Sequence, residues 1–513
     1  MPIVRASVRL DAQLAPPTWT SLRTDISSAE TFSWRRGMAG GGPLDTVART
    51  GICEFGLKNW TDTGGSRVQG WYSPNHANVR SGWTFGIPIR VVVTYSSTEY
   101  VLWRGRLRTI DPMPGRYGAQ RVRCTAHDFM GDLAESDVNV AIQIDKTEVQ
   151  CLQAIVAALP AEAQPVATDY DTALETFPYA LDNLVSGASA LTGVISIGDS
   201  CQGQIFAGAD GTFRYVNRHT WSTTSSNFTF TESMYDREEG LVVPSNLDTV
   251  WNDVIAVAHP KSVSASIVLC GITSAVLVPA NTAVELWLDY ADPTNRERLI
   301  GGKNFVDPLV ENTDYDAQAN ANGSGSDLSA NLTVDVDTFA AKAKFTVTNT
   351  GGTDAYLVNG SGTPLLQLRG DGLLDNAPDR RRSTSTQPYG SRTLTLDLPY
   401  QADGGFALAV AQFNRTRFED LSDQVNALSF DPQRSDALML EALTAEVGDI
   451  VTVSETMTGL ASVEVVVYGI EVDVTKGDYL RVRYITSPAP FGDYWQWGIV
   501  GASEWGETTR YGY

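Results

Sequence analysis

One short segment carries residue types that could do nucleophilic chemistry. Residues 197–201 read Ile-Gly-Asp-Ser-Cys, which is similar to the surroundings of the nucleophilic serine in serine hydrolases. Such a serine needs a base within reach and N–H groups that bind the oxyanion. Here Gly203 follows a Cys and a Gln where a serine protease has consecutive glycines, and the histidines lie in unrelated contexts, at His76, His127, His219 and His259. We therefore predict no catalytic residue and a protein that is not an enzyme.

Signatures of cofactor and metal sites are missing from the sequence. There is no Gly-x-Gly-x-x-Gly after a strand, no Walker loop, no His-Glu-x-x-His and no EF-hand loop. Asp335 and Asp337 alternate along an expected strand and Asp371 precedes a glycine, but alternating acids usually form a solvated strand face. With 60 acidic residues some close carboxylate pair is inevitable, so a pair alone does not predict glycoside hydrolysis. We predict no cofactor and no metal site.

The net charge argues against stable binding of nucleic acid. Lys and Arg number 38 and Asp and Glu number 60, which gives a formal net charge of -22. Proteins that bind nucleic acid use cations to displace counterions from the phosphates. An acidic wall repels the polyanion instead, so DNA could pass such a surface without specific binding.

The cysteines and the apolar runs indicate the cellular compartment in which the protein lies. The cysteines include no Cys-x-x-Cys pair, which indicates reduced, buried thiols at Cys53, Cys124, Cys151, Cys201 and Cys270. No window of about 18 apolar residues is present, and the first residues lack a signal-peptide pattern. We expect no membrane span and a protein that stays in the cytosol of the producing cell.

Any functional site must be positioned by the helices and strands of the fold. The first domain that we predict is a β-domain in residues 1–138. Turn-rich joints at 37–43, 64–65 and 113–115 separate short alternating or apolar runs. The runs are Val4–Leu10, Ile52–Leu57, Ile87–Tyr95, Tyr100–Arg106 and Arg121–His127. They predict a Greek-key or meander β-barrel.

Residues 139–248 predict a small α+β domain. Apolar residues recur at helical spacing from Glu148 until Pro160 stops the run. A second helix is expected at 181–191, where Gly187 weakens it. Asp210-Gly211 between two strand-like runs predicts a tight hairpin.

Residues 249–400 predict a second β-domain with room for an inserted decoration domain. Its expected strands are 254–258, 266–269, 283–288, 343–348 and 365–368. We expect the polar passage 312–327 to be an exposed loop and the basic run 380–382 to lie in a mobile surface loop.

Residues 401–513 predict a helix followed by a β-rich C-terminal domain. The helix is expected at 401–417 with Asp403 as its cap, and the strands at 450–454, 463–474, 479–485 and 494–500. The fold class is therefore mainly β with small α+β additions: a multidomain chain of barrels and a β-sandwich-like C-terminal part. We expect some of these domains to be discontinuous in sequence.

The order of these segments resembles the hub and tail-tip proteins of long-tailed bacteriophages. The opening domain is matched by Cys53–Asn59, Tyr72–His76, Gly86–Val91, Leu102–Leu107 and Arg123–Asp128. Later parts are matched by Ala209–Arg218, Thr346–Tyr356, Leu366–Gly370, Glu446–Val453, Gly469–Glu471, Trp497–Ile499 and Thr508–Gly512. Each segment is a strand-and-turn pattern, and none is a catalytic signature.

The resemblance implies a baseplate hub, which is a structural virion protein of the tail. Hubs of this kind have two tube-like barrels per subunit, and a homotrimer presents six such units between a sixfold tail tube and a threefold tip. The implied partners are further copies of the chain, tail tube or distal tail proteins, tip or fibre proteins and the tape-measure protein. The implied location is the tail tip of the virion, assembled in the host bacterial cytoplasm, as a minor tail protein on the path of genome ejection.

Two alternatives stay open. The 12 Trp and 19 Tyr fit a tail-tip protein that binds a receptor or carbohydrate, because aromatic faces stack on sugar rings. In β-rich assemblies, however, most such residues fill cores or subunit interfaces. A cell-wall hydrolase is the second alternative.

Overall fold

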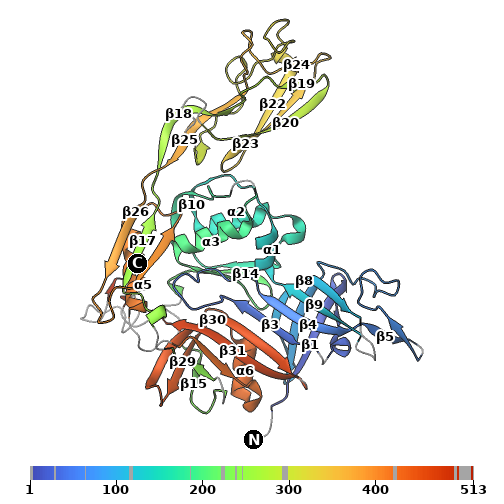
Figure 1. Cartoon of the computed structure of the whole chain (residues 1–513), viewed down its shortest axis with the longest axis vertical. Helices are drawn as coiled ribbons and strands as arrows, with labels where there is room; N and C mark the ends of the chain where they lie inside the picture. Colours follow the sequence, from blue (N-terminus) through green and yellow to red (C-terminus); the bar gives the residue numbers. More distant parts are fainter. Residues whose placement is uncertain are drawn as a thin grey trace.

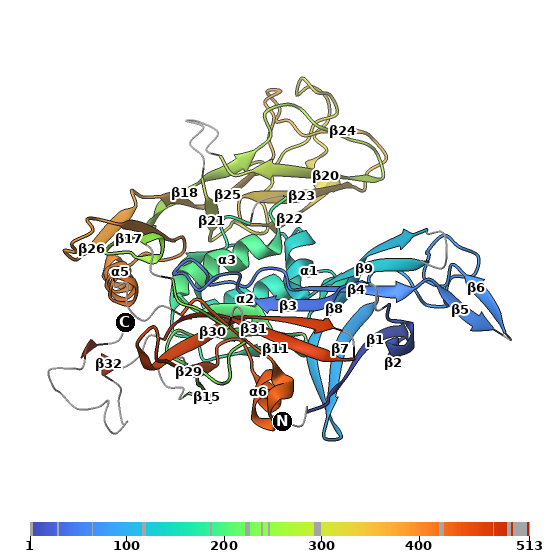
Figure 2. The ribbon, with the colours of Figure 1, turned by 60° about the horizontal axis from the view of Figure 1, so that its bottom comes forward.

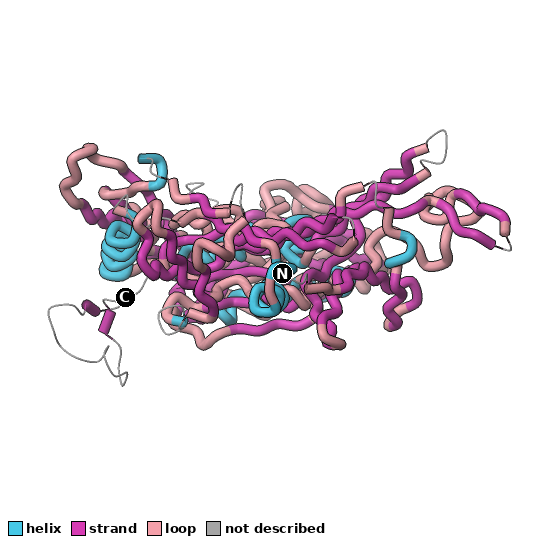
Figure 3. The backbone as a smooth tube through the Cα atoms, turned by 90° about the horizontal axis from the view of Figure 1, so that it is seen from below, coloured by secondary structure: helices cyan, strands magenta, loops and turns pink. Residues whose placement is uncertain are grey.

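The protein is built mainly from β-strands with small α+β additions, as predicted. The computed structural model describes residues 4–27, 30–63, 65–114, 120–184, 187–220, 226–236, 240–244, 247–291, 299–419, 425–475, 477–489, 494–495 and 510–511. Several sheets with few helices make up the molecule (Figure 1), and strands dominate the backbone (Figure 3). No described helix is long and apolar enough to cross a membrane.

The N-terminal barrel comprises residues 4–127. Its alternating sequence places Phe55, Trp103 and Val122 in the core. The hairpin β5–β6 extends from it (Figure 2). Its strands, which confirm the predicted runs, are β1 Ser7–Ala15, β2 Thr18–Ser21, β3 Phe32–Gly37, β4 Ile52–Lys58, β5 Trp60–Thr63, β6 Ser66–Gln69, β7 Pro88–Tyr95, β8 Thr98–Met113 and β9 Arg121–His127.

A crossing segment curves this sheet onto itself. β2 pairs with β1 at one end of the sheet, and the 3-10 turn η1 (Arg23–Asp25) carries the chain from there to β4. At β4, Ile26 forms a bridge with Leu57, and the Ser27 N–H donates to the Gly56 carbonyl over 2.8 Å. The segment from β2 to Ser27 thereby connects the β1 end of the sheet with β4, and the sheet closes into the expected barrel.

The C-terminal barrel is assembled from two distant parts of the chain, residues 226–244 and 425–489. Phe430 packs in its core between Phe230 and Tyr484, with ring centroids 5.1 Å and 5.2 Å apart. The expected domain boundaries do not follow this packing, because the first part of the barrel lies within 139–248. Its elements are β15 Phe228–Phe230, β16 Leu241–Val242, β28 Ala427–Phe430, η5 Pro432–Arg434, α6 Asp436–Thr444, β29 Ile450–Glu455, β30 Leu460–Thr475 and β31 Tyr479–Pro488.

An α+β unit covers residues 128–218. The helix predicted before Pro160 is confirmed, and it begins with a capping box formed by Thr147 and Gln150. The hairpin predicted at 210–211 is confirmed by β13 and β14. The elements are α1 Phe129–Glu135, β10 Gln143–Thr147, α2 Glu148–Ala158, η2 Ala161–Ala163, β11 Ala167–Tyr170, β12 Thr176–Ala180, α3 Ala190–Cys201, β13 Gln204–Ala207 and β14 Thr212–Val216.

The helix predicted at 181–191 is wrong. The chain turns at Leu181, whose φ is +64°, and at Gly187, whose φ is +82°, so α3 begins only at Ala190. Inside α3, a Cβ added to Gly193 would stand 2.9 Å from Ile155 of α2. Gly193 therefore allows α3 and α2 to approach each other closely.

A smaller sheet, in the order β26-β17-β27, carries α5 on one face. Asp403 caps this helix as predicted, since its carboxylate accepts from the Gly405 N–H over 2.7 Å. The mobile loop predicted at 380–382 is wrong, because this run lies on β26 and Arg382 binds Asp253 through two N···O contacts of 2.7 Å. The elements are η3 Leu247–Thr249, β17 Asp253–Ala258, β26 Asp379–Thr384, β27 Thr393–Leu398 and α5 Gly404–Phe418.

An inserted unit, residues 261–375, leaves this sheet through the paired strands β18 and β25 and projects away from the barrels (Figure 1). The exposed loop predicted at 312–327 is wrong in part, because Asp314 is fully buried and Arg369 binds it with contacts of 2.6 and 2.9 Å. The elements are β18 Lys261–Gly271, β19 Leu277–Val278, β20 Thr282–Asp289, β21 Gly301–Lys303, η4 Ser329–Asn331, β22 Leu332–Thr338, β23 Lys342–Asn349, β24 Ala355–Tyr356 and β25 Gln367–Asp375.

Near the end of the chain, β32 Tyr494–Trp495 and β33 Arg510–Tyr511 pair in parallel. The rest of the strand predicted at 494–500 lies outside the described residues. The same holds for the family-like segment 497–499 and for most of 508–512.

Candidate functional site

The two barrels are joined edge to edge by one strand pair, which we call the seam. Strand β3 of the N-terminal barrel pairs antiparallel with β30 of the C-terminal barrel over six residue pairs, from Phe32 with Val474 to Gly37 with Gly469. The seam fuses the barrels into one 13-stranded sheet. Figure 2 shows β3 and β4 side by side with β30 and β31.

Apolar packing holds the two barrels together at the seam. On its buried side Trp34 lies opposite both Val472 and Cys53, and all three side chains belong to one apolar cluster that runs through both barrels. Each large apolar side chain buried in this way contributes about 1.5 to 3 kcal/mol. The barrels therefore share one apolar core.

Two glycines allow the close approach at the end of the seam. Gly37 and Gly469 face each other across the strands. A Cβ on Gly37, whose φ is +90°, would stand 2.4 Å from the Tyr468 carbonyl oxygen, and one on Gly469 would stand 2.5 Å from the Met38 carbonyl oxygen. Both distances are shorter than any real contact, so a side chain at either position would push the strands apart.

Beneath the seam, Arg36 reaches from β3 into the C-terminal barrel. Its guanidinium forms an ion pair with Glu446 and donates to the Ala445 carbonyl over 2.8 Å. Burial lowers the pKa of Arg36 to about 10. The second carboxylate oxygen of Glu446 accepts from the Ala209 N–H of the α+β unit over 3.1 Å. Glu446 is thus the point at which both barrels and the α+β unit meet.

Two further carboxyl groups are buried near this point. Burial raises the pKa of Glu441 to about 7, and the charge of Asp449 adds to this effect. Burial also raises the pKa of Asp449 to about 6, against the opposing influence of Arg36. The two buried carboxyl groups beneath the seam, Glu441 and Asp449, therefore change their protonation near neutral pH.

The solvent face of the seam carries charges in two cross-strand rows. One row runs Glu54, Ser33, Asp473, Arg481, and the other runs Ile52, Arg35, Glu471, Arg483. A shallow groove of 280 Å³ lies over the middle of both rows. Each arginine in these rows has a carboxylate directly beside it, so the face presents balanced charge and no cationic stripe.

The two barrels repeat one pairing pattern. The bridge from Ile26 to Leu57 in the first barrel has its counterpart in the bridge from Tyr235 to Phe430 in the second. The next hydrogen bond is repeated too: Ser27 N–H to the Gly56 carbonyl, and Asp236 N–H to the Ser429 carbonyl, both 2.8 Å. Residues 26–27 are therefore equivalent to 235–236, and residues 56–57 to 429–430.

The long strands repeat as well. β8 and β30 each have 16 residues, and each has a register shift against the following strand, after Leu107 in β8 and after Val467 in β30. Beyond the shift, Asp111 faces Arg123 in the first barrel as Glu471 faces Arg483 in the second. Strands β3, β4, β7, β8 and β9 thus correspond to β16, β28, β29, β30 and β31.

This relationship between the barrels leaves little trace in the sequence. The equivalent strands share register and almost no residues, and a long stretch of chain interrupts the second barrel between β16 and β28. The pairs of an acid on the long strand and an arginine on the following strand, Asp111 with Arg123 and Glu471 with Arg483, are a repeated signal in the sequence.

The serine of the Gly-Asp-Ser segment is packed inside the α+β unit. Ser200 lies on α3, and its hydroxyl donates to the Ser196 carbonyl over 2.6 Å and accepts from the Tyr400 N–H over 2.9 Å. Among the histidines, His259 contacts Asp397 at 2.6 Å, and His127 lies 3.9 Å from Glu135. The recorded partners of the serine are thus backbone groups, and neither is a base.

The acids considered as cation ligands have other surroundings. Asp335 and Asp337 are exposed on alternate positions of β22, as expected of a solvated face. Asp371 accepts from the Asn304 side chain over 2.7 Å. Within the described ranges, no three His, Cys, Asp or Glu side chains come together in a way that could hold a metal ion.

Comparisons with known proteins add likenesses of fold. No protein-family model matches the chain, and no curated protein matches it. Among solved structures, the chain is similar to the 43 kDa tail protein of prophage MuSo2 from Shewanella oneidensis, with 9% identity, coverage of 95% of this chain and 99% of that one, and a TM-score of 0.49. It is similar to the tail protein from Neisseria meningitidis MC58, with 7% identity, coverage of 95% and 99%, and a TM-score of 0.46. It also aligns with the E. coli c3393 protein, a type VI secretion component described as structurally similar to phage tail proteins, with 9% identity, coverage of 90% and 75%, and a TM-score of 0.34.

Proposed function

We propose that this chain is a structural protein of a phage or phage-like tail, that it acts as a hub at the tail tip, and that it is not an enzyme. The observation that carries the proposal is the seam, which makes two equivalent barrels of one chain into a single sheet. A chain of this build presents two similar units to its surroundings. Three copies in a closed ring would present six, which is the number needed to meet a sixfold tube.

The charge on the solvent face of the seam suits a channel wall. Arg35, Arg481 and Arg483 each lie beside a carboxylate in the cross-strand rows. Phosphate groups bind cations that are free to replace counterions. Arg481 is already paired with Asp236 at 2.7 Å and Arg483 with Glu471 at 3.6 Å, so both are poor candidates. DNA would pass such a wall without being retained, although the balanced charge differs from the acidic wall that the net charge of -22 suggests.

The remaining partners follow from this position. Tail tube or distal tail proteins would meet one rim of the ring and tip or fibre proteins the other, with the tape-measure protein passing through the channel. The inserted unit, which projects away from the barrels, would decorate the outside (Figure 1).

The proposal is tested on particles made by a strain that carries this gene. Mass spectrometry of purified tails should detect the chain, and a gold-labelled antibody should mark one end of each tail. A protein that is absent from purified tails, or one that releases soluble fragments from bacterial cell walls when pure, contradicts the proposal.

One observation favours the receptor-binding alternative as a second candidate function. Trp287 on β20 of the inserted unit is 47% exposed, and its ring stacks on Phe339 at 5.3 Å. An exposed indole on a flat sheet face is suited to stacking on a sugar ring. If this candidate is correct, Trp287→Ala abolishes binding of the pure protein to host cells, while Phe85→Ala, which removes an exposed ring from the N-terminal barrel, leaves binding unchanged.

A further inference from the structure

The inserted unit contains the tetrapeptide Asn-Gly-Ser-Gly twice, at residues 322–325 and at residues 359–362. An asparagine that precedes a glycine can lose its side-chain amide spontaneously. Glycine has no side chain to shield its backbone nitrogen, and this nitrogen attacks the Cγ atom of the asparagine. Because the two tetrapeptides are identical, a large difference in reactivity between Asn322 and Asn359 must come from the fold.

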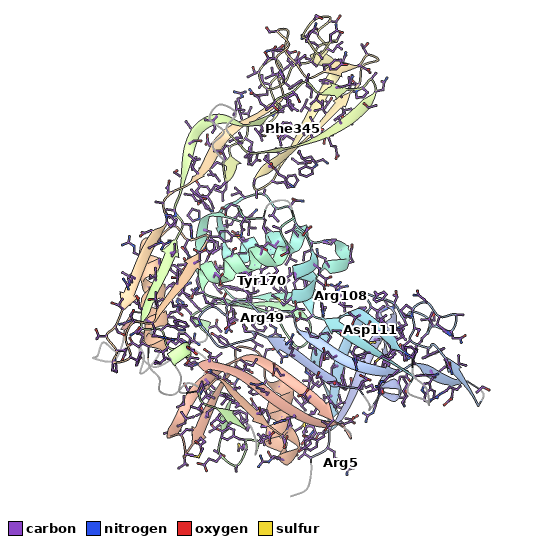
Figure 4. All side chains as sticks on the ribbon, in the orientation of Figure 1. Arg5, Arg49, Arg108, Asp111, Tyr170 and Phe345 are labelled. Atoms are coloured by element: carbon purple, nitrogen blue, oxygen red, sulfur yellow. The ribbon has the colours of Figure 1, made fainter. Side chains whose placement is uncertain are left out.

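Both tetrapeptides lie in loops at one end of the inserted unit. β24 marks this end, which is the part of the unit furthest from the barrels (Figure 1), whereas Phe345 of the apolar core lies nearer to them (Figure 4). The tetrapeptides carry no large apolar side chain, and their backbones touch: a Cβ added to Gly323 would stand 2.2 Å from the Gly362 nitrogen. Hydrogen bonds and backbone contacts therefore decide how each loop reacts.

The side-chain carbonyl of Asn359 is placed for attack. Its oxygen accepts from the Ser361 N–H and from the Thr363 N–H, both over 3.0 Å. The bond to Ser361 closes a ring of atoms that includes Cγ of Asn359 and the Gly360 nitrogen, which keeps the two reacting atoms close together. Both N–H groups also stabilise the negative charge that develops on this oxygen, as the donors of an oxyanion hole do.

The attacking and leaving groups are free at this position. Gly360 is exposed, and nothing lies within 4 Å of a Cβ built on it. Among the described residues, neither the Gly360 N–H nor the Asn359 Nδ2 group has a hydrogen-bond partner. Hydroxide can therefore remove the proton of the Gly360 nitrogen, and the amide nitrogen can leave into solvent.

Asn322 shares the first feature and lacks the second. Its side-chain oxygen accepts from the Ser324 N–H over 3.1 Å and from the Ser324 hydroxyl over 2.6 Å. Gly323, however, is buried against the backbone at Gly362, and its N–H donates to the Asn320 carbonyl over 3.0 Å. Ring closure at Asn322 must break this hydrogen bond and push the two loops apart.

We propose that Asn359 is a site of spontaneous modification in the folded protein and that the fold protects Asn322. The Gly360 nitrogen, after losing its proton to hydroxide, forms a bond to Cγ of Asn359. The bond from Cγ to Nδ2 breaks, and this nitrogen takes a proton from water and leaves as ammonia. Water then opens the five-membered imide at either carbonyl, which gives aspartate or isoaspartate without any change of oxidation state.

The products change the end of the inserted unit. Both replace a neutral amide by a carboxylate, and isoaspartate also adds a methylene group to the backbone. Residue 359 holds its loop through its N–H, which donates to the Thr363 carbonyl over 2.8 Å, and through its carbonyl, which accepts from the Gly362 N–H over 2.8 Å. The added methylene shifts both groups, so the loop changes its shape and its charge as the protein ages. This inference is independent of the proposed function.

Peptide mass spectrometry of the full-length protein after incubation in warm, mildly alkaline buffer tests the proposal. Asn359 should convert at least about tenfold faster than Asn322, with both aspartate and isoaspartate as products. In urea the two rates should become similar, because the tetrapeptides are identical. Equal rates in the native protein overturn the proposal, and so does a ratio that is as large in urea. Aspartate as the sole product at 359 also overturns it, because direct hydrolysis by water then bypasses the imide.

A pair of glycine variants gives a second readout. Gly360→Ala should slow the conversion of Asn359 by at least about tenfold, because the Cβ shields the attacking nitrogen. The fold tolerates this change, since the space around the added Cβ is open. Gly352→Ala, at another position of the inserted unit with open space, should leave the rate unchanged. An unchanged rate in Gly360→Ala, or an equal loss of rate in both variants, overturns the proposal.

Discussion

Arg36 on β3 of the N-terminal barrel forms an ion pair with Glu446 of the C-terminal barrel, beneath the strand pair that joins the two. The arginine side chain is 4% exposed and the glutamate 20%. Arg35, its neighbour in sequence, points the other way into solvent. Consecutive residues of one strand thus serve the two faces of the joint, and this contrast gives a matched pair of variants.

Arg36→Met should destabilise the folded protein by about 3 kcal/mol, because removing one partner of a buried ion pair leaves the other charge without compensation. Arg35→Met should change the free energy of unfolding by less than about 0.5 kcal/mol, as substitutions of exposed side chains usually do. Urea denaturation of the two variants measures both effects. Equal losses of unfolding free energy would show that Arg36 does not tie the barrels together.

Gly469→Ala should lower the free energy of unfolding by about 1 to 3 kcal/mol, which is the usual cost of forcing an added methyl group into a packed site. Its Cβ would stand 2.5 Å from the Met38 carbonyl oxygen. Gly360→Ala is the control, since nothing lies within 4 Å of a Cβ there. Thermal unfolding followed by circular dichroism compares the two, and an unchanged midpoint for Gly469→Ala would contradict the close approach at the seam.

Glu441 predicts how stability depends on pH. Its pKa is raised from 4.5 to about 7, so between these values the folded protein binds a proton that the unfolded chain has released. Stability is therefore lost as pH rises through this window. Glu441→Gln should stabilise the protein by about 2 to 3 kcal/mol at pH 8 and have little effect at pH 4. The amide oxygen can still accept from the Tyr484 hydroxyl, which lies 3.3 Å from the carboxylate.

The matched control for this prediction is Glu464→Gln, at an exposed position on β30. Denaturation curves at both pH values decide the matter. A Glu441→Gln variant that is destabilised at pH 8 and not at pH 4 would show that the carboxylate stabilises the fold in its charged form.

Thiol labelling tests the burial of the cysteines. All five are buried and free, and burial raises the pKa values of Cys151, Cys201 and Cys270 to about 12. Because the thiolate is the reactive form, a maleimide should modify none of them in the native protein and all of them in urea. Mass spectrometry counts the adducts, and rapid labelling of the native chain would contradict the packing of the three apolar cores that hold these cysteines.

Local signals predicted the local parts of the fold. The helix before Pro160, the hairpin at 210–211 and the cap at Asp403 each depend on residues a few positions apart, and each is confirmed. The prediction of a helix at 181–191 was wrong for a local reason too. Leu181 adopts a left-handed backbone conformation, which a leucine in the sequence does not indicate.

The candidate site could not be read from the sequence because its contacts are distant. Phe32 pairs with Val474, and Arg36 meets Glu446, more than 400 residues further along the chain. Arg382 was expected in a basic loop, but it lies on β26, where its guanidinium binds Asp253 of β17. Pairing of this kind depends on which edges the fold brings together, and the same strand patterns allow many arrangements.

A cryo-electron microscopy reconstruction of the assembled full-length protein tests the central claim most directly. We expect a closed ring of three copies in which six barrels surround a channel, with the β3 and β30 seam inside each copy. A monomer, or an assembly in which the barrels of one copy do not share a continuous sheet, would contradict the account.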